Sequence, residues 1–108
     1  MSIKQLFAKK WAKRAVNNTN KWAQNPIATQ EKVLKMLLQK AKNTAFGQDH
    51  GFAQIDNYED FAKQVPVRDY EGLRPYVDRV VAGEADILWP GKPRYFSKTS
   101  GTTSGVKY

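Results

Sequence analysis

The chain has 108 residues, a length that permits one small domain at most. It contains no cysteine, which excludes disulfides and thiolate metal sites. The net charge of +8 is uneven, because residues 1–42 carry +9 and residues 43–108 carry −1. No apolar run approaches the roughly 20 residues that span a bilayer, and residues 1–22 lack the apolar core of a secretory signal. We therefore expect a cytoplasmic protein without a transmembrane segment.

A first helix is predicted from residue 3 onward, where apolar side chains recur at helical spacing. The four polar residues 17–20 are expected to weaken this helix, because their short side chains compete for backbone hydrogen bonds. We interpret the apolar stripe as core contact, although a helix lying on a membrane surface or a mitochondrial presequence would share the pattern. The stripe consists of Ile3, Leu6, Phe7, Trp11, Ala15 and Trp22.

The basic charge of residues 4–42 has two interpretations. Charge runs usually mark a solvated helix face, so we expect only weak, nonspecific binding of polyanions. The alternative is a basic helical module that binds nucleic acid or a membrane surface and has no catalytic activity. That alternative predicts exposed aromatic side chains, so burial of Trp11 and Trp22 would count against it.

A second helix is predicted from Pro26 to Ala41, since Asn25 is a good N-cap and proline suits the first helical position. We expect it to end at Asn43 and a turn at Phe46-Gly47, with a loop over residues 48–56. His50 is the only histidine. Without a second ligand at metal-binding spacing, a structural role is favoured.

Two further helices follow. Asn57 is expected to cap a short helix over residues 58–64, and Asp69 to cap the next turn. A helix then runs from Leu73 to Val81 or Ala82, with Gly83 as its stop. Its expected buried face consists of Tyr76, Val77, Val80 and Val81. We interpret the mixed charges of residues 68–79 as surface pairs without a catalytic role.

The end of the chain is predicted to be a strand and a loop. Residues 94–99 read as a strand, and residues 106–108 as the start of its hairpin partner. Between them two glycines lie four apart among hydroxyl side chains, with a lysine just beyond. Such a loop can direct N–H groups, hydroxyls and an ammonium toward phosphate oxygens. The alternative is an ordinary Ser/Thr/Gly-rich turn or tail.

The loop Thr99-Ser100-Gly101-Thr102-Thr103-Ser104-Gly105-Val106-Lys107 resembles the phosphate-binding motif of adenylate-forming enzymes. An extra residue before the second glycine and the missing proline are similar to one branch, the auxin-responsive (Gretchen Hagen type) acyl acid amido synthetases. Several upstream pieces also resemble that branch. They are Thr44-Ala45-Phe46-Gly47, His50-Gly51-Phe52, Val65-Pro66-Val67, Tyr70-Glu71, Tyr76 through Arg79, and Gly83-Glu84.

The resemblance implies an α/β fold of the adenylate-forming type, of which this chain is an N-terminal part. Residues 1–85 would form a helical layer, and residues 86–108 the first strand and phosphate-binding loop. The implied reaction activates a carboxylic acid with ATP and Mg²⁺ and transfers it to an amino acid. We expect the 108 residues alone to be inactive. The implied ATP-binding residues are Ser100, Gly101, Thr102, Thr103, Ser104, Gly105 and Lys107, and no catalytic or metal-binding residue is assigned.

Overall fold

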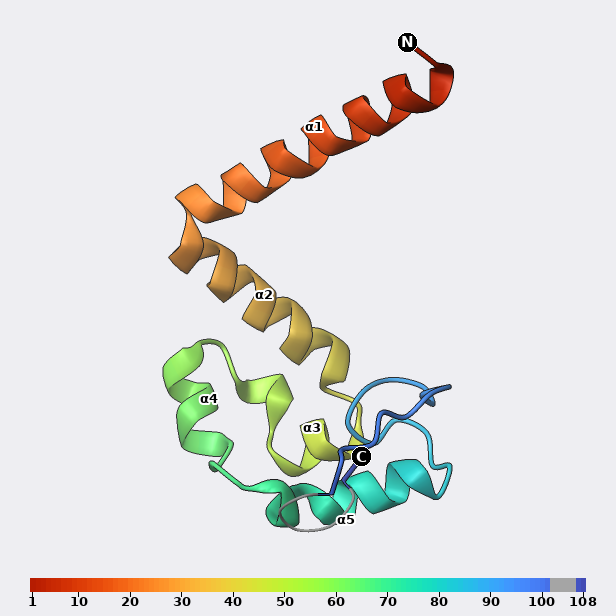
Figure 1. The fold of residues 1–108 in the computed structure, drawn as a ribbon. Helices are drawn as coiled ribbons and strands as arrows, with labels where there is room; N and C mark the ends of the chain where they lie inside the picture. Colours follow the sequence, from red (N-terminus) through yellow and green to blue (C-terminus); the bar gives the residue numbers. More distant parts are fainter. Residues whose placement is uncertain (102–106) are drawn as a thin grey trace. The chain divides into compact units, whose positions relative to one another are not determined.

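The structure is a computed structural model that describes residues 1–101 and 107–108. The chain divides into two compact units, residues 1–33 and residues 34–108, and each is described by itself. The order of elements is α1, α2, α3, the 3-10 helix η1, α4 and α5, as Figure 1 shows from red to blue. The described part of the chain is therefore mostly helical, as the sequence predicts.

Helix α1, Ile3–Gln24, dominates the first unit. Ser2 begins it with a reciprocal capping box, in which its hydroxyl accepts the Gln5 N–H and the Gln5 side chain accepts the Ser2 N–H. The helix continues through residues 17–20, so the expected weakening there is wrong. Asparagine and threonine cost well under about 1 kcal/mol each in a helix, too little to interrupt one of 22 residues.

The apolar stripe of α1 lies exposed. Trp11 is 73% exposed and Trp22 is 54% exposed, and α1 contains no buried residue. Within the residues that the structure describes, the interpretation of this stripe as core contact is therefore not met. The exposure that the binding-module alternative requires is present.

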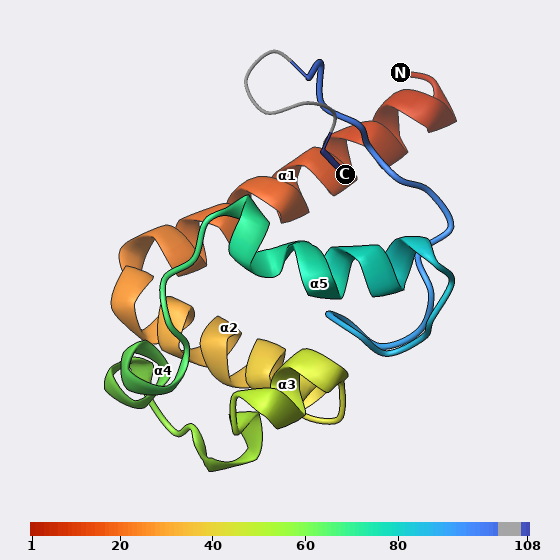
Figure 2. The same ribbon diagram turned by 90° about the horizontal axis from the view of Figure 1, so that it is seen from below.

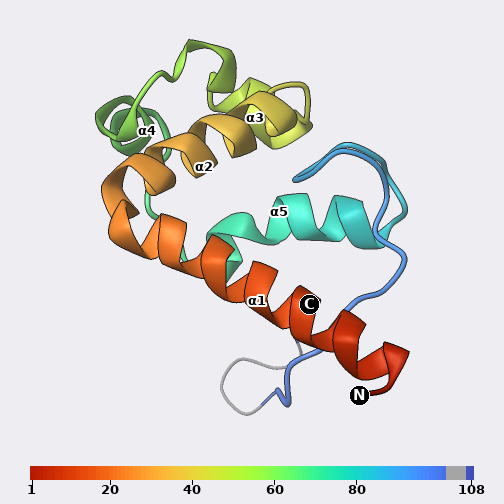
Figure 3. The same cartoon turned by 90° about the horizontal axis from the view of Figure 1, so that it is seen from above.

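Helix α2, Pro26–Ala41, begins where the sequence places it, directly after Asn25. Its last turns belong to the second unit, where Leu38 and Ala41 are buried. The predicted loop that follows is wrong in part, because α3, Ala45–Asp49, and η1, Phe52–Gln54, form there. Figure 3 shows α3 next to the C-terminal end of α2.

Thr44 explains the unexpected helix α3. Its side chain is 1% exposed and makes two hydrogen bonds. The hydroxyl donates to the Ala41 carbonyl at 2.7 Å and accepts the Gly47 N–H at 3.0 Å. One threonine thus closes α2 and caps α3. Two more donors at the start of α3 bind a distant segment, since Ala45 N–H donates to the Asp86 carbonyl and Phe46 N–H to the Ile87 carbonyl, both at 2.9 Å.

Helices α4, Tyr58–Gln64, and α5, Tyr70–Val81, confirm the predicted caps. Asn57 accepts the Asp60 N–H at 2.8 Å, and Asp69 accepts the Gly72 N–H at 2.9 Å. Gly83 follows α5 with a φ of 96°, a conformation that glycine adopts at helix ends. The predicted buried face is wrong at Val81, which is 39% exposed, and its other members are half-buried.

The predicted strand over residues 94–99 is wrong, because no strand occurs in residues 1–101 or 107–108. A strand requires a neighbour that takes its backbone hydrogen bonds along its length. Here the described residues supply one such bond, from Thr99 N–H to the Lys107 carbonyl at 2.9 Å. Figure 2 shows the chain after α5 turning back toward that helix before it continues to this extended segment.

The core of the second unit is small and partly aromatic. Leu38, Ala41, Ile55 and Ile87 are its buried apolar side chains. The Phe46 ring stacks on His50 at 4.0 Å and meets the Tyr76 ring edge-on at 5.0 Å. His50 is buried and its Nδ1 lies 2.7 Å from the Phe46 carbonyl oxygen, so its predicted structural role agrees with its position. None of the helices within residues 1–101 is both long and apolar enough to cross a membrane.

Candidate functional site

The base of the loop that the sequence predicts to bind phosphate is closed by two hydrogen bonds between the same two residues. Thr99 N–H donates to the Lys107 carbonyl at 2.9 Å, and Lys107 N–H donates to the Thr99 hydroxyl at 3.0 Å. The two ends of the loop are therefore held side by side. The proposed site residues Thr102, Thr103, Ser104 and Gly105 lie outside the described residues, as does Val106.

Gly101 has a φ of 75°, within the left-handed region that residues with a Cβ rarely occupy. Glycine reaches this conformation without steric cost, which is why it suits a loop of this kind. Ser100, its neighbour on the arm that leads into the loop, is exposed. Both features are compatible with backbone and hydroxyl groups that face a ligand.

Lys107 lies against an aromatic ring. Its Nζ atom lies 5.3 Å from the centroid of the Tyr70 ring, close enough for a cation–π interaction. Within residues 1–101 and 107–108 the two ion pairs are Arg74–Glu71 and Arg79–Glu84, and neither involves Lys107. Its positive charge is therefore not neutralised by a carboxylate in the described part of the chain.

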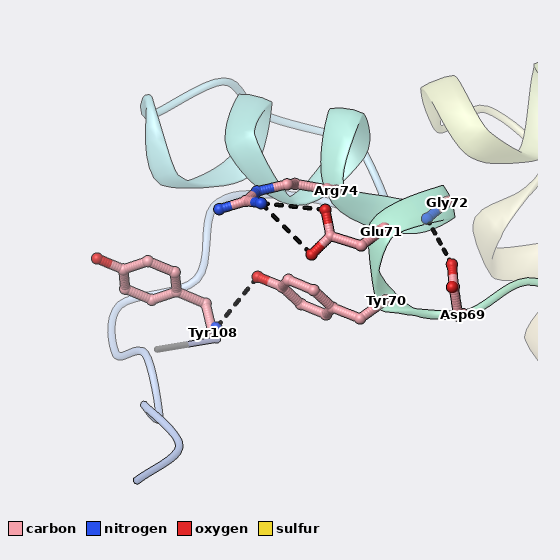
Figure 4. Close-up of polar contacts among 6 residues, drawn as sticks. All are labelled: Asp69, Tyr70, Glu71, Gly72, Arg74 and Tyr108. Atoms are coloured by element: carbon pink, nitrogen blue, oxygen red, sulfur yellow. Dashed lines mark hydrogen bonds and ion pairs between the residues drawn. The ribbon is translucent and has the colours of Figure 1, made fainter. Parts of the chain in front are cut away.

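The next residue, Tyr108, is held by three neighbours. Its backbone N–H donates to the Tyr70 hydroxyl at 3.2 Å, a contact drawn in Figure 4. Its ring meets Phe96 edge-on at 5.9 Å, and Lys98 Nζ lies 5.2 Å from its centroid. The segment after the loop is thus tied both to the arm before it and to the start of α5.

An apolar pocket of about 390 Å³ adjoins the base of the loop. Val77 and Val80 of α5 form one side, and residues 87–93 form another. Phe96 and Tyr108 complete the lining, so the same aromatic pair that flanks the loop also borders this pocket. Trp89 lines it and remains 47% exposed.

The charged groups of α5 form surface pairs. Arg74 lies 3.0 Å from Glu71, and Arg79 lies 3.1 Å from Glu84, with about half of each side chain exposed. The hydrogen bond that Arg74 donates to Glu71 raises the pKa of Arg74, and the one that Arg79 donates to Glu84 raises the pKa of Arg79. Neither change brings a group into the range where it could exchange protons near neutral pH. No cluster of three metal-binding side chains occurs in the part of the chain that the structure describes.

Tyr76 links α5 to α3 through a hydrogen bond. Its hydroxyl donates to the Asp49 carboxylate at 2.7 Å, and this bond, with burial, raises the pKa of Tyr76 above its ordinary value. The neutral phenol is therefore favoured by the fold. Its contribution to stability is fully present below the ordinary tyrosine pKa and is lost as the pH rises through the raised value.

We expect Tyr76→Phe to lower the free energy of unfolding by about 1 kcal/mol at neutral pH, because it removes this hydrogen bond. The difference from the unaltered chain should disappear at strongly alkaline pH, where the phenol ionises. Urea unfolding at the two pH values measures both effects. Tyr95→Phe is the control, since Tyr95 is 89% exposed. An equal loss at both pH values would assign the effect to packing.

The sequence matches a model of the GH3 family N-terminal domain over residues 15–108, which is most of the chain. The chain belongs to the GH3 family. This confirms the resemblance to the auxin-responsive acyl acid amido synthetases. The first half of α1 lies before the GH3 match, and the base of the loop and all of the second unit lie within it.

Individual proteins of the GH3 family are also similar to this chain in sequence. An Arabidopsis thaliana protein named indole-3-acetic acid-amido synthetase GH3.15 is 36% identical over 70% of this chain and 13% of its own length. A Nicotiana attenuata protein named jasmonoyl-L-amino acid synthetase JAR6 is 32% identical over 70% of the chain and 13% of its own length. A further Arabidopsis relative, indole-3-acetic acid-amido synthetase GH3.2, is 29% identical over 87% of the chain and 17% of its length. No solved structure matches significantly.

The chain thus spans 13 to 17% of the length of these GH3 relatives. Two of these names describe amido synthetases of indole-3-acetic acid, and the third describes a synthetase of a jasmonoyl-L-amino acid. Among the residues assigned to the site, the structure describes Ser100, Gly101 and Lys107. Tyr70 was missed: it is part of the quoted Tyr70-Glu71 pair, yet nothing in its local sequence indicates a contact with a segment 38 residues away.

Proposed function

We propose that this chain is the N-terminal part of an ATP-dependent, acyl-adenylate-forming ligase that conjugates a carboxylic acid to an amino acid. Membership in the GH3 family is the observation that carries the proposal. The adenylation domain would be α/β, with residues 1–85 as a helical layer and residues 86–108 as the loop-bearing segment. The chain alone is proposed to be inactive, since it matches no more than 17% of the length of the relatives named above.

The proposed first step joins the acid to the nucleotide. The carboxylate attacks the α-phosphorus of ATP and displaces pyrophosphate, which gives an acyl-adenylate. The amine of the amino acid then attacks the acyl carbon, and AMP leaves as the amide forms. The work of the protein in such a displacement is positioning and stabilisation of charge.

The loop is proposed to hold the β- and γ-phosphates of ATP. The hydroxyls of Ser100, Thr102, Thr103 and Ser104 would donate to phosphate oxygens. Gly101 and Gly105 would let the backbone approach closely, and Lys107 would supply positive charge. The positive φ of Gly101 and the Lys107 ammonium without a carboxylate partner in the described residues support this assignment.

Magnesium is proposed to accompany ATP, because the triphosphate itself provides ligands for it. The described residues offer no metal-binding cluster of their own, so no step is assigned to protein–metal contacts. A cytoplasmic location is proposed because ATP and free amino acids are available there.

Lys107→Ala tests whether the loop holds the phosphates of ATP. The substitution is made in a full-length GH3 protein that contains this chain. We expect the KM for ATP in ATP–pyrophosphate exchange to rise roughly tenfold to a hundredfold, the effect of losing one charge-assisted hydrogen bond. The KM for the carboxylic acid should stay unchanged. Lys63→Ala, at the end of α4, removes the same charge away from the loop and is the control. Equal effects of the two variants would contradict a phosphate role.

A second candidate function, that of a binding module for polyanions, is favoured by the exposed aromatics of α1. Trp11 and Trp22 lie on a helix that carries six basic and no acidic side chains. If the charge only marks a solvated helix face, we expect weak binding of duplex DNA and of anionic vesicles at low salt, lost at physiological salt because counterion release drives it. Fluorescence titration at the two salt concentrations measures it. Tight, sequence-selective binding that tolerates salt would promote this function above the ligase.

A further inference from the structure

We infer that Tyr70 is a positioning residue that anchors the far end of the phosphate loop and orients Lys107 toward the ligand. This inference rests on the proposed function of the loop. Tyr70 itself would touch neither ATP nor the acid. Its role would be to fix the backbone and the ammonium that follow the loop.

One side chain makes both contacts. The Tyr70 hydroxyl accepts the Tyr108 N–H at 3.2 Å, and the centroid of the Tyr70 ring lies 5.3 Å from Lys107 Nζ. Figure 4 shows the Tyr70 side chain extending from the first turn of α5 to the Tyr108 backbone. Two consecutive residues at the end of the loop are therefore held by one residue that lies 38 positions before Tyr108.

Tyr70 is a firm support because its own position is fixed. It is the first residue of α5, directly after the N-cap Asp69, which accepts the Gly72 N–H at 2.9 Å. Tyr70 is itself half-buried. Tyrosine has few rotatable bonds, and its backbone here belongs to a capped helix. The Tyr70 side chain can therefore hold the end of the loop in one position.

The second attachment comes from the other arm of the loop. Thr99 and Lys107 exchange two hydrogen bonds, so the loop base is tied to its own entry arm as well as to α5. Thr99 fixes the separation of the two arms, and Tyr70 fixes the direction of the arm that carries Lys107. Removing Tyr70 should therefore leave the loop closed and its lysine misdirected.

The choice of an aromatic partner for Lys107 suits a phosphate site. A carboxylate in this position would neutralise the ammonium and compete with phosphate. A tyrosine ring attracts the ammonium more weakly than an ionised oxygen does, so it holds the lysine without neutralising its charge. Holding the side chain in advance reduces the conformational entropy that binding must remove.

Two substitutions of Tyr70 distinguish its hydrogen bond to Tyr108 from the contact of its ring with Lys107. Tyr70→Phe keeps the ring and removes the hydroxyl acceptor, and Tyr70→Leu removes both. Tyr58→Phe is the matched control, because Tyr58 is also the first residue of a helix after a side-chain N-cap and is 69% exposed. All three variants are made in a full-length GH3 protein that contains this chain.

Two measurements are compared for each variant. Hydrogen–deuterium exchange of the peptide that contains Lys107 and Tyr108 reports the anchor itself. ATP–pyrophosphate exchange reports the KM for ATP and for the carboxylic acid. We expect faster deuterium uptake in both Tyr70 variants. The KM for ATP should rise roughly fivefold for Tyr70→Phe, and roughly tenfold or more for Tyr70→Leu, with the KM for the acid unchanged.

The possible outcomes distinguish a failure of the positioning role of Tyr70 from a failure of the phosphate function of the loop. Unchanged deuterium uptake in both Tyr70 variants would overturn the inference, because no anchor would exist. Faster uptake with an unchanged KM for ATP would also overturn it, since Tyr70 would then serve structure alone. If Gly101→Val and Lys107→Ala keep full pyrophosphate exchange, the phosphate function of the loop fails. If those two lose activity while the Tyr70 variants do not, only the role of Tyr70 fails.

Discussion

Replacing Gly101 by valine is expected to lower the rate of ATP–pyrophosphate exchange by about a hundredfold or more, the order of effect seen when a preorganised donor to developing charge is lost. The φ of Gly101 is 75°, and a β-branched residue is strongly disfavoured there. The loop would have to change its path, which would move its N–H groups and hydroxyls away from the proposed phosphate site. The measurement uses a protein with the full length of a GH3 enzyme.

A matched control separates backbone strain from loss of the site. Gly83 has a φ of 96°, and apart from its two chain neighbours no described residue has an atom within 4 Å of the position that a Cβ would take there. Gly83→Val therefore imposes comparable strain outside the loop without a steric clash. We expect this variant to lose stability and to keep its pyrophosphate exchange rate at permissive temperature. Near-native exchange in Gly101→Val would show that the loop is a structural turn.

Gly47→Ala is expected to destabilise the second unit by about 3 kcal/mol or more, at the upper end of overpacking effects. A Cβ at Gly47 would lie 2.0 Å from the Ala41 carbonyl oxygen and 3.0 Å from its carbon, and both are backbone atoms. That carbonyl cannot retreat freely, because it also accepts the Thr44 hydroxyl at 2.7 Å. The added methyl should therefore force α2 and α3 apart.

Thermal or urea unfolding of the 108-residue chain measures this loss. Gly72→Ala is the control, since its Cβ would meet only the Arg68 side chain, at 3.1 Å. Alanine also favours the helical state over glycine by up to about 1 kcal/mol, so Gly72→Ala should be close to neutral. Equal stability of the Gly47 and Gly72 variants would contradict the close packing of α2 against α3.

The helices that the sequence predicts well are those with local signals. Asn57 and Asp69 cap α4 and α5 with side chains that bind N–H groups three residues on, so the necessary information lies within a few residues. Pro26 marks the start of α2 in the same way. Such features depend little on the rest of the fold, which is why pattern alone identifies them.

Other features depend on distant partners and were missed. Helix α3 has only five residues and contains Gly47, so its sequence resembles a turn. Thr44 caps it locally, but its first two N–H groups also need the carbonyls of residues 86 and 87, a contact that the local sequence does not show. The expected strand over residues 94–99 failed for the converse reason, since the described chain offers it a single backbone bond.

The candidate site also contains residues that the sequence predicts and one that it does not. Ser100, Gly101 and Lys107 come from the motif, and the positive φ at Gly101 is compatible with the proposed loop. Tyr70 was beyond reach, because its contacts with residues 107 and 108 depend on how α5 lies relative to the loop. The residues of a motif can be identified from the sequence, whereas the residues that contact the motif in the folded chain cannot.

The bonds from residues 45 and 46 to the carbonyls of residues 86 and 87 also bear on the order of folding. A helix of five residues has no stability alone, because nucleation costs more than so few hydrogen bonds return. During synthesis, which proceeds at roughly 5–20 residues per second, we therefore expect α3 to become stable only after residues 86 and 87 have left the ribosome. Until then the aromatic rings of Phe46 and His50 lack their complete surroundings.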